Sequence, residues 1–162
     1  MKKTILVIAA LLLISVSLSG CDAIKDFIDK KHNVSFGEKS EGEKISYEDA
    51  EMKYVSNTSK SLTVEIENNT ASTWQSGNMK DYSLEAEKDG EWYYVTQIGE
   101  FANTMELMIF APGDKITHTF KFENRYGILS PGKYRVVKNY WANATETTES
   151  GSFQLVCEFT VE

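Results

Sequence analysis

Two cysteines and two histidines carry the most reactive side-chain chemistry in this chain. Cys21 follows the most apolar stretch of the sequence, and Cys157 lies near the C-terminus with no histidine close to it. Nucleophilic catalysis needs a base beside the nucleophile. The two histidines fall in a polar N-terminal segment (His32) and in an expected strand (His118). The pattern predicts no catalytic residue, and it predicts that His118 is a core or half-buried packing residue.

The carboxylates also lack the grouping that a metal or a general acid and base would need. Glu65 and Glu67, and likewise Glu85 and Glu87, alternate with apolar residues, so each pair is expected on the solvated face of a strand. Calcium needs several oxygen ligands that converge from loops. The carboxylates of the expected loops are isolated from one another: Asp81, Asp89 and Asp114. Without a glycine-rich phosphate loop or a zinc-type spacing, the sequence predicts no metal, no cofactor and no enzymatic activity.

The N-terminus has the three parts of a secretory signal. MKK is a basic start, TILVIAALLLISVS is an apolar run, and LSG is a small-residue end. The apolar run has 14 residues, which is short of the ~20 that cross a bilayer core. A signal peptide over residues 1–20 is therefore favoured over a permanent transmembrane helix.

The four residues Leu18-Ser19-Gly20-Cys21 resemble the bacterial lipobox. The resemblance implies that the Cys21 thiol takes a diacylglycerol, that cleavage follows Gly20, and that the protein is lipid-anchored at the extracytoplasmic face of the cell membrane. Each buried CH₂ of an acyl chain contributes ~0.8 kcal/mol of membrane affinity. Asp22 would resemble an inner-membrane retention signal in a double-membrane cell, and the sequence does not decide between envelope types.

The expected mature chain is acidic. Lys2 and Lys3 leave with the signal while all acidic residues remain, so the formal net charge falls from −7 to −9. Such a surface repels phosphate backbones and anionic wall polymers, so nucleic acid is not an expected partner.

Residues 21–44 are expected to form a lipidated N-terminus and a tether. The segment is rich in charge and ends in Gly, Ser, Glu and Lys, a composition typical of flexible linkers. Ile24, Phe27 and Ile28 have helical spacing, which leaves open a short helix lying on the membrane surface. A disordered spacer is favoured, because one turn of apolar residues is too little to stabilise a helix.

From residue 45 to residue 162 the pattern is that of short strands. Apolar residues alternate with polar ones in SFQLVCEFTVE, LTVEIEN and KITHTFKF. Cys157 falls on the apolar face of its strand and is expected to be a small buried hydrophobe. About seven such strands, with turn signals at APGD, ENRYG and SPG, predict an all-β antiparallel sandwich.

The hairpin YSLEAEKDGEWYYV allows two registers. A two-residue Asp89-Gly90 loop pairs Lys88 with Glu91 and turns Tyr93 and Val95 toward the Leu84 face. A loop that also includes Lys88 pairs Glu87 with Glu91 and buries Trp92 and Tyr94 instead. The second register is the prediction, because tryptophan gains most from burial.

Several motifs together resemble the bacterial immunoglobulin-like domains found on lipoproteins of Gram-positive bacteria. They are LTVEIEN, YSLE, DGEWYYV, APGD and ILSPGKYRVVKNYW, within roughly residues 52–161. The resemblance implies an immunoglobulin-like sandwich and brings no catalytic residues. Leu129, Pro131 and Tyr134 resemble a tyrosine corner, in which a tyrosine hydroxyl binds an upstream backbone group. The inter-sheet disulfide of antibody domains is missing.

Three stretches could supply a binding surface. Residues 98–114 are rich in methionine and aromatic residues, residues 141–152 form a polar stretch between the last two strands, and Trp74 lies beside a turn. The candidate residues are Trp74, Phe101, Met105, Met108, Phe110 and Trp141. Each has a structural alternative: a core strand of Met105, Leu107 and Ile109 with Met108 and Phe110 under a neighbouring loop, a disordered connector at 141–152, and a Trp74 that fills the core.

Two kinds of function compete. The first is a membrane-held interaction module for an envelope protein or a glycan, including an inhibitor of an envelope hydrolase or protease. The second is a structural spacer or wall-assembly accessory with no tight partner. An exposed apolar patch that joins residues 98–114 to residues 141–152 would favour the first, since monomeric proteins rarely expose such patches without a partner.

Overall fold

The computed structural model describes residues 34–41, 44, 47, 49–99, 106–145 and 150–162. These residues all belong to one compact unit, Val34–Glu162. The predicted signal, the lipobox and the first part of the predicted tether lie outside the described residues. No helix in the part of the chain that the structure describes is long and apolar enough to cross a membrane.

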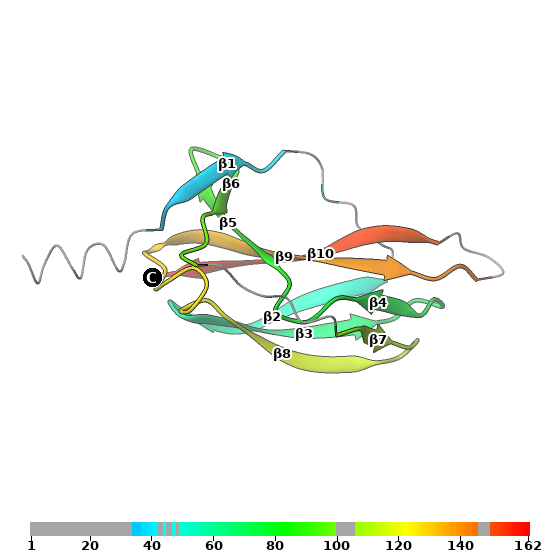
Figure 1. Cartoon of the computed structure of the whole chain (residues 1–162). Coiled ribbons are helices and arrows are strands. Elements are labelled where there is room, and N and C mark those ends of the chain that lie inside the picture. The colour runs from blue at the N-terminus through cyan, green and yellow to red at the C-terminus, as the bar shows by residue number, and fades with distance from the viewer. Residues whose placement is uncertain (1–33, 42–43, 45–46, 48, 100–105, 146–149) are drawn as a thin grey trace, which may run out of the picture. The chain divides into compact units, whose positions relative to one another are not determined.

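The described residues form ten strands in two antiparallel sheets (Figure 1). The larger sheet has the order β1-β6-β5-β9-β4-β7, with β10 on the other side of β9, and the smaller has the order β2-β3-β8. The predicted all-β sandwich is confirmed. The strands are β1 Phe36–Lys39, β2 Ala50–Thr58, β3 Ser61–Asn68, β4 Trp74–Ser76, β5 Ser83–Lys88, β6 Glu91–Val95, β7 Met108–Phe110, β8 Lys115–Lys121, β9 Gly132–Ala142 and β10 Gly151–Val161.

The core lies between the two sheets and follows the alternation in the sequence. β3 buries Leu62, Val64 and Ile66, and β10 buries every second residue from Phe153 to Val161. Cys157 is one of these buried residues, as predicted. Burial raises the pKa of its thiol to about 11, with a smaller contribution from Glu158. A thiol with this pKa is almost entirely protonated at neutral pH, so Cys157 acts as a packing residue.

The predicted tether ends earlier than expected, because residues 36–39 are a strand. β1 pairs with β6, with Phe36 opposite Val95 and Lys39 opposite Tyr93. The side chains of β1 are all exposed, so the strand has no apolar alternation that could mark it in the sequence. Backbone hydrogen bonds hold it in place, including Ser40 N to Trp92 O at 2.8 Å.

The β5–β6 hairpin adopts the register that the sequence analysis rejected. Lys88 pairs with Glu91 around a two-residue Asp89-Gly90 turn, and both turn residues have positive φ, 56° and 81°. This turn is favoured because its twist matches that of the flanking strands. Tyr94 is therefore exposed, and Trp92 is only half-buried. Trp92 finds its contact on the outer face instead, where the Arg135 guanidinium lies 4.3 Å from its ring centre.

The predicted tyrosine corner is present. The Tyr134 hydroxyl donates a hydrogen bond of 2.8 Å to the Ser130 carbonyl at the start of β9. Burial raises the pKa of Tyr134 to about 12. The bond ties the turn before β9 to a residue that faces the core.

We predict that Tyr134→Phe lowers the free energy of unfolding by about 1–2 kcal/mol, because it removes the hydrogen bond from the Tyr134 hydroxyl to the Ser130 carbonyl. Urea denaturation of the purified domain measures the change. Tyr93→Phe is the matched control, because the Tyr93 hydroxyl makes no hydrogen bond to the described residues, and it should shift stability by less than about 0.5 kcal/mol. Equal effects of the two substitutions would contradict a stabilising corner.

Candidate functional site

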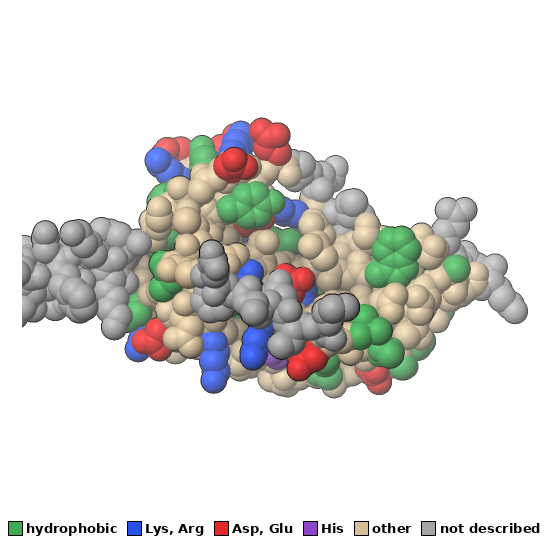
Figure 2. Space-filling model, viewed as in Figure 1, with side chains coloured by type: hydrophobic (Ala, Val, Ile, Leu, Met, Phe, Trp, Pro, Cys, Tyr) green, Lys and Arg blue, Asp and Glu red, His purple; other side chains and the backbone are tan. Residues whose placement is uncertain are grey.

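An exposed apolar row crosses one end of the larger sheet. Ile109 on β7 is opposite Gln75 on β4, and Gln75 is opposite Trp141 on β9. Residues in register share a face, so these three side chains point the same way, and Leu107 lies two positions before Ile109. The exposed fractions of the apolar members are 61% for Leu107, 62% for Ile109 and 45% for Trp141. We call Leu107, Ile109 and Trp141 the apolar row; hydrophobic side chains gather at the right-hand end of the view in Figure 2.

The structure corrects part of the predicted binding surface. Trp74 and Phe110 are 0% and 1% exposed, so they belong to the core and not to a surface. Their ring centres lie 6.2 Å apart, and Trp74 also packs edge-on against Phe153 at 5.1 Å. Met108 is partly buried against the core. Only Trp141 of the candidate residues is exposed among those described; Phe101 and Met105 lie outside the described residues.

The alternative interpretation of residues 105–110 as a core strand also predicted the wrong buried face for the described residues. It placed Leu107 and Ile109 in the core, whereas both are exposed and Phe110 is buried. Phe110 is the register partner of Trp74, which lies in the core. Register partners share a face of the sheet, so Phe110 is buried as well. A run of apolar residues without polar interruption does not tell which face is buried.

The predicted polar loop at 141–152 is shorter than expected. β9 runs to Ala142 and β10 starts at Gly151, with Gly151 opposite Ala142 and Ser152 opposite Trp141. Residues 146–149 lie outside the described residues. The two stretches predicted to form a surface therefore meet in one sheet, where only β4 separates β7 from the end of β9.

The predicted half-buried His118 is confirmed. Its ring lies edge-on to Phe120, with 4.7 Å between the ring centres. Burial, and to a lesser degree the charge of Lys138, lowers the pKa of His118. The side chain is therefore neutral at pH 7 and packs as an aromatic residue. Within the described residues, no three His, Cys, Asp or Glu side chains lie together as metal ligands would.

A buried ionic cluster on the outer face of the larger sheet was missed in the sequence. The Glu85 side chain is fully buried, whereas the sequence predicted a solvated carboxylate. Its Oε1 accepts hydrogen bonds from Ser40 Oγ at 2.9 Å and from Lys44 Nζ at 2.8 Å. Its Oε2 accepts from Arg135 Nε at 2.7 Å, and the Arg135 Nη2 atom lies 2.6 Å away. Arg135 is the register partner of Glu85 on β9, so its contact is cross-strand, whereas Ser40 and Lys44 come from between β1 and β2.

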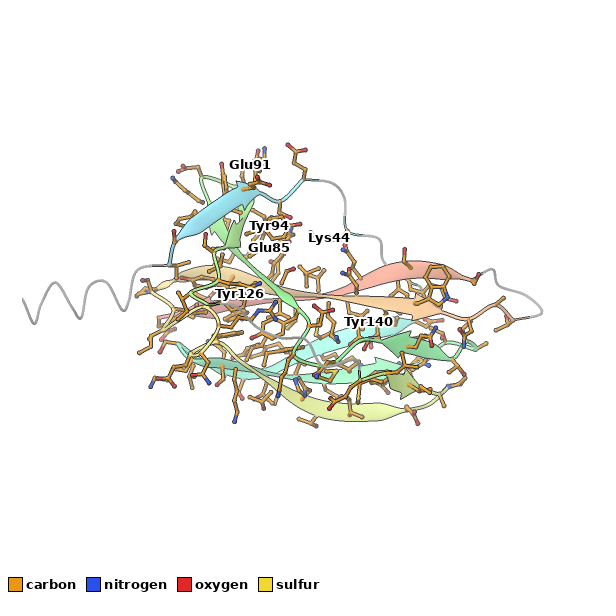
Figure 3. All side chains as sticks on the ribbon, viewed as in Figure 1. Lys44, Glu85, Glu91, Tyr94, Tyr126 and Tyr140 are labelled. Carbon is orange, nitrogen blue, oxygen red and sulfur yellow. The ribbon has the colours of Figure 1, made fainter. Side chains whose placement is uncertain are left out.

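Two adjoining hollows open above this cluster, and we call them together the polar hollow. The larger, about 740 Å³, is lined by Lys39, Ser40, Glu41, Lys44, Glu91, Trp92 and Arg135. The smaller, about 480 Å³, is lined by Glu41, Lys44, Tyr94, Asn139, Ser152, Phe153 and Gln154. In Figure 3 Glu91 and Tyr94 lie on the side of β1 and β6, and Lys44 lies on the side of β9 and β10.

A buried lysine holds the turn before β5 from inside the sandwich. Lys138 Nζ donates to the backbone carbonyls of Asn78 and Asp81, each at 3.0 Å. Burial lowers the pKa of Lys138 to about 8, and the Asp81 carboxylate opposes this shift. Lys138 is therefore a structural residue, because its charged end is occupied by backbone oxygens and is only 1% exposed.

We predict that Glu85→Leu destabilises the domain by about 3 kcal/mol, because it leaves two largely buried cations without their anion. Guanidinium denaturation measures the free energy of unfolding. Glu158→Leu is the control, since Glu158 forms an exposed ion pair of 2.7 Å with Lys133, and such pairs contribute less than about 1 kcal/mol. If the two variants lower the free energy of unfolding by the same amount, the Glu85 cluster does not stabilise the fold.

The comparison with known proteins agrees with this architecture. A family model described as a bacterial Ig-like domain matches residues 39–154, which is most of the chain and includes every strand from β2 to β9. No curated protein matches the sequence. The match begins at Lys39, the last residue of β1, a strand that lies within the predicted tether. The chain therefore belongs to the bacterial Ig-like domain family.

Proposed function

We propose that the protein is a non-catalytic, lipid-anchored module on the extracytoplasmic face of the membrane, and that it binds an envelope protein through the apolar row. The observation that carries the proposal is the register Ile109–Gln75–Trp141, which joins the two predicted stretches in one exposed surface.

The anchor rests on Cys21. The Leu18-Ser19-Gly20-Cys21 motif stands directly after the apolar run of the signal. Cys157 is buried and its thiol pKa is raised, so it is not available for lipid attachment. A diacylglycerol has two acyl chains, and two chains hold a protein stably at a membrane where one does not.

The apolar row suits a protein partner better than a small ligand. Ile109 and Trp141 lie on strands of one sheet with the polar Gln75 between them, and no residue of the row lines either part of the polar hollow. Tryptophan is enriched among the residues that dominate protein interfaces. A spacer without a partner would gain nothing from exposing Trp141, Ile109 and Leu107 together to water.

The position of the row within the domain also supports presentation to a partner. In Figure 1, β1 begins on the left, where the C-terminus also lies, and β4, β7 and the end of β9 lie on the right. The chain thus enters the sandwich at the end opposite the apolar row. A domain held through β1 would present the row away from its point of attachment.

For the anchor, we predict that the mature protein begins at Cys21 and that its N-terminal peptide carries the mass of a diacylglyceryl group, measured by mass spectrometry. Cys21→Ala should move the protein from the membrane fraction to the soluble fraction. An unmodified Cys21, or a Cys21→Ala protein that stays in the membrane fraction, would show that the protein has no lipid anchor.

For the partner, we predict that cross-linking in the intact envelope yields a discrete product that disappears in the double variant Ile109→Ser/Trp141→Ser. The double variant Val55→Ser/Ile98→Ser is the control, because it removes two side chains of similar exposure, 52% and 67%, outside the row. Circular dichroism verifies that both variants fold. A product that survives in the first variant excludes the row as the interface, and no product in any form favours the structural spacer.

A further inference from the structure

The polar hollow is separate from the apolar row in its chemistry and has aromatic groups on one side. Trp92 and Tyr94 are two residues apart on β6, so their side chains share one face of the strand. Trp92 lies over Arg135, and the Tyr94 ring lies 5.9 Å from Lys44 Nζ. Tyr94 is 38% exposed. The Tyr94 ring is therefore partly exposed beside the hollow, with Lys44 Nζ over it, and the strand fixes its position.

The cations around the hollow are already paired with carboxylates, and Glu41 adds a further carboxylate to the lining. Glu85 binds both Lys44 and Arg135, and Lys39 Nζ lies 3.1 Å from Glu91 at the rim. An anionic ligand would have to compete with these carboxylates for the cations, so the hollow suits a neutral polar ligand better than an anion.

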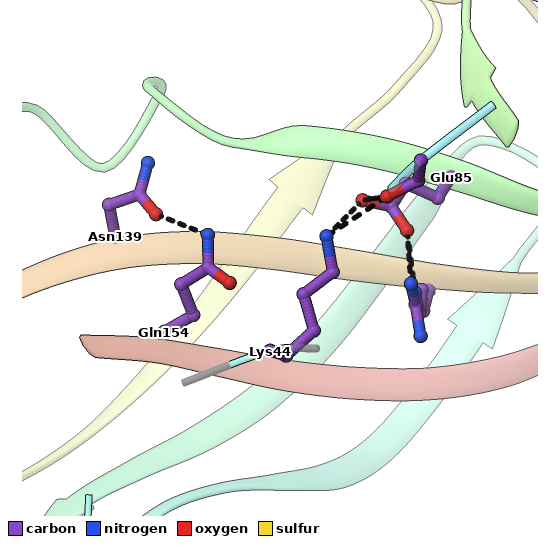
Figure 4. Close-up of polar contacts among 6 residues, drawn as sticks. Lys44, Glu85, Asn139 and Gln154 are labelled. Atoms are coloured by element: carbon purple, nitrogen blue, oxygen red, sulfur yellow. Dashed lines mark hydrogen bonds and ion pairs between the residues drawn. The ribbon is translucent and has the colours of Figure 1, made fainter. Parts of the chain in front are cut away.

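Two amide side chains on the same face offer one donor and one acceptor. Gln154 on β10 is the register partner of Asn139 on β9, and Gln154 Nε2 donates to Asn139 Oδ1 at 2.9 Å (Figure 4). This bond leaves the Asn139 Nδ2 group as a donor and the Gln154 Oε1 atom as an acceptor, neither with a hydrogen-bond partner among the described residues. Asn139, Gln154 and Tyr94 all line the smaller hollow.

We propose that the polar hollow binds a glycan unit that carries an acetamido group. A secondary amide has one N–H donor and one carbonyl acceptor, which complement Gln154 Oε1 and Asn139 Nδ2. The apolar face of the sugar ring packs on Tyr94, and the sugar hydroxyls, which both donate and accept, reach the polar rim at Glu41 and Ser152. The site is concave and combines an aromatic surface with a few placed polar groups, as small-ligand sites do.

Isothermal titration of the full-length protein in detergent tests this site, with chitotetraose as the acetamido probe and cellotetraose as the matched sugar without it. We expect chitotetraose to bind at least about tenfold more tightly. The double variant Asn139→Ala/Gln154→Ala should lose about tenfold in affinity for chitotetraose, and Tyr94→Ala should lose affinity as well. These side chains point outward, and an unchanged thermal midpoint verifies that each variant folds.

Three results would overturn the proposal: no heat from chitotetraose up to about 10 mM, equal binding of the two sugars, or full binding by a folded Tyr94→Ala protein together with a folded double variant. The Leu107→Ser/Ile109→Ser protein separates this site from the apolar row, because neither residue lines the polar hollow. It should bind chitotetraose with the affinity of the unchanged protein. The titration then tests the glycan site independently of the proposed protein interface.

Discussion

The buried carboxylate of Glu85 is the constraint on which the outer face of this domain depends. Glu85 points away from the core and would be solvated if nothing covered its strand, yet it is fully buried. An unpaired carboxylate without water would cost several kcal/mol. Arg135 pairs with it from the neighbouring strand β9. Ser40 and Lys44, from the segment between β1 and β2, complete the cluster. The cluster thereby holds the chain after β1 against the sheet, and it creates the walls of the polar hollow.

The same cluster explains why the sequence predicted the core better than the outer face. Core strands such as β3 and β10 alternate apolar and polar residues, and the tyrosine corner is local, because Ser130 and Tyr134 are four positions apart. These features depend on neighbours in the sequence. Glu85 is 41 positions from Lys44 and 50 from Arg135, and nothing in the alternation of β5 shows that distant residues will cover it. β1 was missed for a related reason, because its side chains are exposed and its partners, such as Glu91 for Lys39 and Tyr93 for Phe36, are distant in the sequence.

Where the sequence allowed two local patterns, the prediction was wrong because contacts between distant residues decided which pattern forms. The hairpin prediction gave Trp92 to the core, but the Asp89-Gly90 turn set the register, and Arg135 supplied a surface for the ring. In the 98–114 stretch, Phe110 faces inward because Trp74 lies opposite it. Leu107 and Ile109 are exposed as a consequence. The apolar row therefore combines one predicted aromatic residue, Trp141, with two aliphatic residues that the sequence analysis had assigned to the core, Leu107 and Ile109.

β9 carries residues of both surfaces, the polar hollow and the apolar row, on one well-packed strand. Its inward residues Tyr134, Val136, Lys138 and Tyr140 are buried, and its outward residues include Arg135, Asn139 and Trp141. Arg135 belongs to the Glu85 cluster, Asn139 lines the polar hollow, and Trp141 belongs to the apolar row. Because packing, the tyrosine corner and the Lys138 contacts hold the inner face, the outer side chains need little ordering when a partner binds. Less entropy is lost on association to such a strand than to a loop, which supports the proposal that this domain binds through a sheet face.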